Sequence, residues 1–144
     1  MKRKLDSDDL TSNFYEGVRI LGIVAPMKSY SFCWLVNHHL CLDFRMSKDI
    51  EIKLAKRQRI YFFKVYECPE QHNSLVHYLY INQFDGEYLL PEFRHLDYLW
   101  MLKGDVVRDD EVIALMQSVR DIGSVQLVTE IFCDKIKNKE HLLF

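Results

Sequence analysis

The chain has 144 residues, of which 49% are hydrophobic and 28% charged, and its formal net charge at pH 7 is −2. This composition is typical of one globular domain and excludes an intrinsically disordered chain. The missing basic excess argues against a protein that binds nucleic acid through the phosphate backbone. No apolar run approaches the ~18 residues of a membrane span, and the N-terminus lacks the apolar segment of a signal peptide. We therefore expect a cytoplasmic protein that contacts no membrane.

Residues 1–13 are polar, and we expect them to form a flexible segment ahead of a single domain over residues 14–144. The domain begins with a strand pattern over residues 14–25, which Pro26 ends. Its alternate residues are apolar on both faces: Val18, Ile20, Gly22 and Val24 on one, and Leu21, Ile23 and Ala25 on the other. A strand with two apolar faces is typical of the centre of a sheet.

A helix is predicted over residues 29–40, with Ser29 or a neighbour as its N-terminal cap. Apolar residues recur there with the period of a helix and form one stripe, made of Phe32, Leu35, Val36, His39 and Leu40. We expect this stripe to be buried, with His39 packed in the core or at its rim.

Further strands are predicted over residues 44–54, 60–66, 75–82, 88–90 and 98–102. The dipeptide Asp85-Gly86 is typical of a tight hairpin turn, and residues 56–59 form a second polar turn.

A second helix is predicted to open at Asp109-Asp110, with Gly123 as its C-terminal cap. The last strand covers residues 125–131. Residues 142–144 are apolar, so we expect the end of the chain to dock on the domain.

The predicted order is therefore a strand, a helix, five strands, a helix and a strand. Helices set far apart among hairpin-linked strands predict an α+β fold, a two-layer sandwich with a mostly antiparallel sheet and two main helices. The last strand-helix-strand unit, residues 98–132, should cross over right-handedly as a parallel pair. With the first strand and helix, it suggests an elaborated ferredoxin-like topology.

The four cysteines lie far apart, without a Cys-x-x-Cys pair, and are expected to be free and mostly buried thiols. One cluster, residues 37–41, contains two adjacent histidines and a cysteine. Structural zinc sites pair their ligands at short spacing in two places, and adjacent histidines point to different sides of a helix. We therefore expect neither a metal nor another cofactor.

Residues 88–104 place several charged side chains between two apolar runs. Pro91 fixes φ and suits the start of a helical turn. Glu92 then lies where a carboxylate can accept free backbone N–H groups, and Asp97 can tie the turn to neighbouring backbone. On this interpretation, which we favour, the stretch is a structural corner.

The alternative interpretation is functional. Glu92 and Asp97 would form a carboxylate pair, with His95 transferring protons and Arg94 binding an anion. Chemistry of this kind requires a cleft and shifted pKa values. These four residues are the candidate catalytic residues.

The run from Leu90 to Tyr98, Leu-Pro-Glu-Phe-Arg-His-Leu-Asp-Tyr, resembles the signature Ile-Pro-Glu-x-x-x-Val-Asp-Tyr of a bacterial family named after that pattern (IPExxxVDY). Leu90 stands where the signature has Ile and Leu96 where it has Val, and both substitutions keep the position apolar. Residues 33–37 and 138–144 also resemble that family. The resemblance implies a small cytosolic bacterial protein, and it carries no activity, cofactor or catalytic residue. Trp34, Asn37 and Tyr98 are candidate binding residues next to the signature.

Two predicted strands carry aromatic side chains on one face and apolar ones on the other. The aromatic face contains Tyr61 and Phe63 on one strand and Tyr78 and Tyr80 on the next. A sheet covered by helices on one side only should be polar on its second side. A partner subunit, the chain's own tail or stacked RNA bases could cover it, and the lack of basic charge favours self-association.

These observations favour a non-enzymatic binding or interaction module that forms a homodimer through its sheet. The alternatives are a small enzyme or small-molecule binder at Glu92 and Asp97, and an RNA-binding accessory protein that uses the aromatic sheet face.

Overall fold

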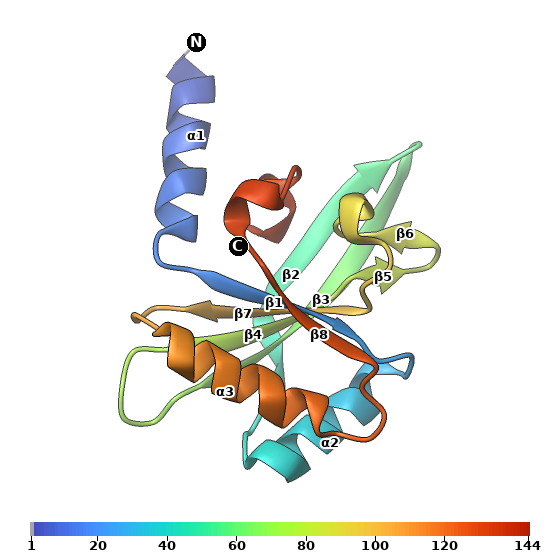
Figure 1. Cartoon of the computed structure of the whole chain (residues 1–144). Coiled ribbons are helices and arrows are strands. Elements are labelled where there is room, and N and C mark those ends of the chain that lie inside the picture. Colours follow the sequence, from blue (N-terminus) through green and yellow to red (C-terminus); the bar gives the residue numbers. More distant parts are fainter. Residues whose placement is uncertain (1) are drawn as a thin grey trace.

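The computed structural model describes residues 2–144, and the side chains from residue 8 onward. Its helices are α1 (Lys2–Tyr15), α2 (Ser29–Leu40) and α3 (Asp109–Arg120), with three short 3₁₀ turns, η1 (Pro91–Phe93), η2 (Cys133–Lys135) and η3 (Lys139–Leu142). Its strands are β1 (Arg19–Val24), β2 (Arg45–Lys56), β3 (Arg59–Pro69), β4 (Val76–Ile81), β5 (Gln83–Phe84), β6 (Glu87–Tyr88), β7 (Tyr98–Lys103) and β8 (Leu127–Ile131). Figure 1 shows how they are arranged. The predicted α+β fold is confirmed.

The main sheet has six strands in the order β2-β3-β4-β7-β1-β8, and every neighbouring pair is antiparallel. The first strand lies inside the sheet and not at its edge, which agrees with its two apolar faces: Ile20 lies opposite Met101 of β7 on one side and Ile131 of β8 on the other. The predicted parallel pairing of residues 98–132 needs correction. β7 and β8 run in the same direction, but β1 lies between them.

Four of these strands, in the order β8-β1-β7-β4, form a ferredoxin-like core with α2 and α3. The β2–β3 hairpin is an insertion between α2 and β4 that extends this sheet at one edge. The predicted turn between β2 and β3 is present, and Arg57 and Gln58 both have positive φ there. Asp85 and Gly86, in the turn between β5 and β6, also have positive φ. β5 and β6 pair with each other as a separate two-stranded ribbon.

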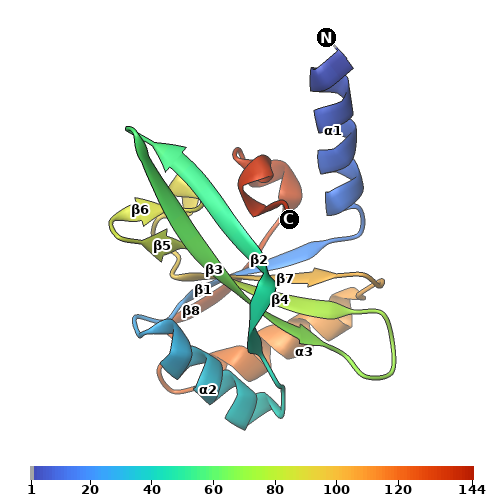
Figure 2. The same ribbon diagram turned by 180° about the vertical axis from the view of Figure 1, so that it is seen from behind.

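Helices α2 and α3 lie on the same face of the sheet (Figures 1 and 2). The bounds of α2 match the predicted residues 29–40. Phe32 and Val36, which belong to the predicted apolar stripe, are fully buried. The N-cap is Lys28, a neighbour of Ser29 as predicted, and its side chain makes no capping bond. The expected burial of His39 was wrong, because His39 is exposed. Gly123 is also not a left-handed cap, because α3 ends at Arg120 with Asp121 in right-handed conformation.

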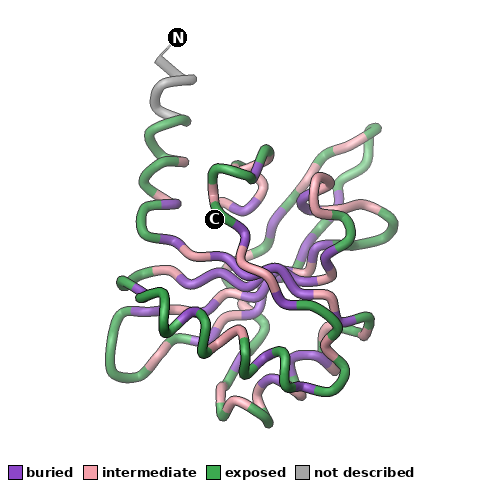
Figure 3. The backbone as a smooth tube through the Cα atoms, viewed as in Figure 1, coloured by how far each residue is buried: buried purple, intermediate pink, exposed green. Residues whose placement is uncertain are grey.

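The opposite face of the sheet is covered by the chain itself. The C-terminal segment lies over it between α1 and the β2–β3 hairpin (Figure 1), and the tube of Figure 3 is buried where these segments meet the sheet. Leu142 is fully buried, and its carbonyl accepts a hydrogen bond of 2.8 Å from the hydroxyl of Tyr80. The hydroxyl of Tyr15 donates to the carbonyl of Lys139 at 2.6 Å. The buried residues of this face therefore form a second apolar cluster, separate from the one under the helices.

The N-terminal residues that we expected to be flexible form α1, which projects from the body (Figures 1 and 2). The helix continues to Tyr15, so the predicted start of the first strand at residue 14 was wrong, and β1 begins at Arg19. Gly17 turns the chain between the two elements with φ of +69°. Among the described helices, none has the length and apolar character needed to cross a bilayer.

Candidate functional site

Glu92, at the corner formed by η1, is bound to the C-terminal tail. Its Oε2 accepts hydrogen bonds from the backbone N–H groups of Lys137 (2.7 Å) and Asn138 (3.0 Å), and its Oε1 accepts one from the side-chain amide of Asn138 (2.8 Å). Burial would raise the pKa of this carboxyl, but the hydrogen bonds outweigh it and hold the pKa below its ordinary value. Glu92 is therefore an ionised clamp for the tail.

Asp97 is bound to the end of β1. Its Oδ2 accepts a hydrogen bond of 2.8 Å from the backbone N–H of Ala25, and its own N–H donates to the carbonyl of Ile23 at 2.8 Å. We expected bonds within the turn, and the structure shows bonds across to another strand. Arg94 and His95 are exposed. The corner thus directs its two carboxylates to different segments and does not assemble them as a pair.

Asn82, which no sequence pattern singled out, organises the same corner from its centre. It is fully buried. Its side-chain amide donates to the carbonyls of Phe93 and Leu96, each at 2.9 Å, while its Oδ1 accepts from the N–H of Leu90 at 2.9 Å. An isolated asparagine at the end of a strand gives no periodic signal, and the partners become visible only in the folded chain.

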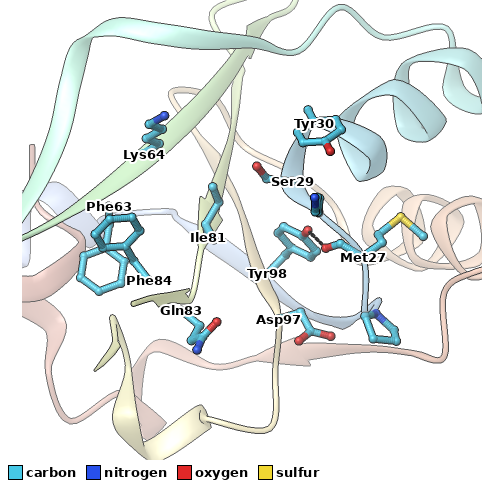
Figure 4. Close-up of a pocket in the computed structure, with 12 residues that line it drawn as sticks. Met27, Ser29, Tyr30, Phe63, Lys64, Ile81, Gln83, Phe84, Asp97 and Tyr98 are labelled. Atoms are coloured by element: carbon cyan, nitrogen blue, oxygen red, sulfur yellow. Dashed lines mark hydrogen bonds between the residues drawn. The ribbon is translucent and has the colours of Figure 1, made fainter. Parts of the chain in front are cut away.

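An open pocket of about 590 Å³ lies beside this corner, between the start of α2, β3 and the β5–β6 ribbon (Figure 4). Phe63 and Phe84 form one wall, with ring centroids 6.2 Å apart. Tyr30 and Ser29 of α2 form the opposite wall. Ile81 and Tyr98 lie between these walls (Figure 4). The volume is within the range of small-molecule sites, about 300–1,000 Å³.

The charge of this pocket comes from three side chains and from the start of a helix. Lys28, Lys64 and Asp97 line it, so its charged side chains sum to one positive charge. The first N–H groups of a helix have no partner within the helix, and the side chain of the N-cap residue of α2, Lys28, makes no capping bond to them. They add partial positive charge at the same wall.

Tyr98 holds the loop that leads into this wall. Its hydroxyl donates to the carbonyl of Met27 at 2.6 Å, and burial raises its pKa far above the ordinary value. The pocket therefore brings together three predicted candidates, Phe63, Asp97 and Tyr98, which come from different strands and loops.

The other candidates next to the signature lie elsewhere. Asn37 pairs with the backbone of Phe44, accepting from its N–H at 2.8 Å and donating to its carbonyl at 3.2 Å. Trp34 is 64% exposed on the outer side of α2 and stacks on His38, with ring centroids 5.2 Å apart. Neither residue lines the pocket.

The aromatic sheet face is closed. Tyr61, Phe63 and Tyr80 are buried by the chain's own segments, and Tyr78 is partly covered by Phe144. Our expectation that this face is open to a partner subunit or to RNA bases was wrong. The C-terminal tail, one of the covers considered from the sequence, occupies it.

All four cysteines are free thiols, and Cys33 and Cys68 are buried. Burial raises the pKa of Cys33 to about 12. In the described part of the chain, no three His, Cys, Asp or Glu side chains are grouped as ligands of a metal ion.

No protein-family model matches the chain, and no curated protein sequence matches it either.

Proposed function

We propose that the protein is a non-catalytic binding module that takes a small organic anion with a flat apolar body into the pocket of about 590 Å³ at the start of α2. The observation that carries this proposal is the pairing of aromatic walls with an uncapped helix N-terminus and two lysines. The exposed rings of Phe84 and Tyr30, on opposite walls, suit a flat apolar body. The positive groups suit an anionic substituent.

Binding fits the geometry better than catalysis. A general acid or base must have its proton-transferring atom free to reach a substrate. Both oxygens of Glu92 are bonded to the tail, and one oxygen of Asp97 is bonded to Ala25. These carboxylates support the proposal of a module that holds a ligand without transforming it.

A fluorescence titration with anilinonaphthalene sulfonate, which is an aromatic anion, tests the proposal. We expect saturable binding to the native chain, and a dissociation constant raised roughly threefold to tenfold by Phe84→Ala. Lys64→Gln should raise it by about threefold. Phe132→Ala is the matched control, because Phe132 is also exposed but lies outside this pocket. Equal affinities of the Phe84 and Phe132 variants would reject the site.

Self-association is a second candidate function, and the outer side of α2 is the surface that favours it. Tyr30 is 63% and Trp34 64% exposed there, one helical turn apart. Exposed aromatic residues are enriched at protein interfaces. Sedimentation velocity of the native chain should then show a dimer that Trp34→Ala converts to monomer. A native monomer at high concentration would exclude this candidate.

We also propose, on the motif of residues 90–98 alone, that the chain belongs to the bacterial family of that signature and acts in the cytoplasm.

A further inference from the structure

A second pocket of about 450 Å³ lies between the end of α2, α3 and the ends of β4 and β7. Most of its lining is apolar and consists of Leu40, Leu42, Leu75, Leu102, Val107 and Leu115. Its carboxylates are Glu70 and Glu111, and its imidazoles are His39 and His77. Among the side chains that the structure describes, no lysine or arginine lines it. The pocket therefore combines an apolar interior with negative charge.

A buried chain of hydrogen bonds fixes the proton positions on one side of this pocket. Trp100 is fully buried, and its indole Nε1 lies 3.0 Å from Nδ1 of His77. An indole N–H can only donate, so Nδ1 is the acceptor and the imidazole hydrogen lies on Nε2. That nitrogen is 2.7 Å from Oε2 of Glu70. His77 is therefore a neutral donor to the Glu70 carboxylate, and neither ring nitrogen is free.

Glu70 is held in place by its own loop as well. Its Oε1 accepts from the side-chain amide of Asn73 at 2.9 Å, and its backbone N–H donates to the carbonyl of Leu75 at 2.9 Å. Burial would raise the pKa of Glu70, but the bonds from Asn73 and His77 outweigh it and lower the pKa. The carboxylate is thus ionised at neutral pH.

The charge of Glu70 has no cationic partner within the described residues, because its one close basic neighbour is the neutral His77. Glu111 does have a cationic partner, because Nε of Arg108 lies 3.0 Å from its Oε1. A carboxylate that is partly buried and held only by neutral donors is complementary to a cation. An apolar lining beside it is complementary to a hydrocarbon body.

We infer that this pocket binds a small organic ammonium ion, with the ammonium group on Glu70 and the apolar body against the leucines between α2 and α3. The site is separate from the pocket at the start of α2, and its ligand has the opposite charge. The two sites can therefore be tested independently.

Nuclear magnetic resonance of the two tryptophan indole N–H groups tests the inference, with phenethylammonium as the probe. The indole of Trp100 is linked to Glu70 through His77, whereas the exposed Trp34 lies outside the pocket. We expect saturable shifts of the Trp100 signal and none of the Trp34 signal, which a Trp34→Phe variant identifies. Phenethyl alcohol, the neutral analogue, should bind about tenfold more weakly or worse.

Glu70→Gln keeps the shape of the side chain and its acceptor for His77 while removing the charge. It should weaken phenethylammonium binding by about tenfold or more. Glu51→Gln, at an exposed carboxylate of β2 outside the pocket, should leave it unchanged. If Glu70→Gln does not fold, Leu115→Phe, which narrows the pocket, replaces it and should also weaken binding. Unchanged affinity in the folded variant, equal affinity for the alcohol, or no shift of the Trp100 signal would each overturn the inference.

Discussion

At the scale of single residues, the Glu92 clamp has a measurable energy. Three hydrogen bonds from the tail reach its carboxylate, and bonds to an ionised acceptor are stronger than neutral ones. We expect Glu92→Gln to lower the free energy of unfolding by about 1–2 kcal/mol, measured by urea denaturation at neutral pH. Glu16→Gln, at an exposed carboxylate, is the control and should change it by less than about 0.5 kcal/mol.

The same clamp should depend on pH. Because the pKa of Glu92 is lowered in the folded protein, its contribution is complete above the ordinary carboxyl pKa and is lost as the pH falls through the lower folded value. The stability difference between the native chain and Glu92→Gln should therefore be constant near neutral pH and shrink below about pH 4. A difference that grows on acidification would contradict the clamp.

Sequence reasoning at this scale found the acceptors but not their donors. The composition of residues 91–97 predicted carboxylates that accept backbone N–H groups, and both Glu92 and Asp97 do so. The donors at Lys137 and Ala25 are distant in sequence, and only the folded sheet brings them close. Asn82 escaped prediction for the same reason, since its partners are backbone groups of a loop.

At the scale of elements, prediction succeeded where a periodic apolar stripe or a turn dipeptide was present. The α2 helix and the Asp85-Gly86 turn have such signals. The α1 helix has none, because its sequence is polar and lacks a stripe that would pack on the body. The Gly123 cap failed because a glycine after a helix permits a left-handed cap without requiring one.

Gly22 of β1 gives a prediction at this scale. A Cβ at this position would overlap the side chain of Leu96 and lie 2.9 Å from Cδ1 of Ile131. We expect Gly22→Ala to lower the free energy of unfolding by about 1–3 kcal/mol, because the core of the corner must shift to admit the methyl group. Gly123→Ala is the matched control, since no atom lies within 4 Å of its Cβ position. Equal urea midpoints for the two variants would show that the corner is loosely packed.

At the scale of the whole molecule, the sheet has a buried apolar cluster on each face, and the sequence could indicate only that the second face needed a cover. Apolar residues on both sides of Ile60–Tyr66 are equally compatible with a subunit, a ligand or a tail. The choice depends on a contact between the C-terminal segment and β4, and sequence periodicity contains no information on such distant contacts. The hydrogen bond from the hydroxyl of Tyr80 to the carbonyl of Leu142 shows that the tail is the cover.

Leu142 therefore carries a prediction for the whole domain. It is fully buried, although it lies near the C-terminus. We expect Leu142→Ala to lower the free energy of unfolding by about 2–5 kcal/mol. Leu127→Ala, at a leucine that is 43% exposed, should lower the free energy of unfolding by less than half of that amount. A small effect at Leu142 would mean that the tail is dispensable for the fold.

The position of β1 bears on how the chain is made. Arg19 pairs with Leu102 and Val24 pairs with Leu127, so β1 is synthesised before both of the strands that flank it in the sheet. Contacts between such distant segments slow folding. During translation, the apolar run from Ile20 to Val24 has no neighbouring strand to pair with until β7 has emerged, and it stays unpaired for that whole interval.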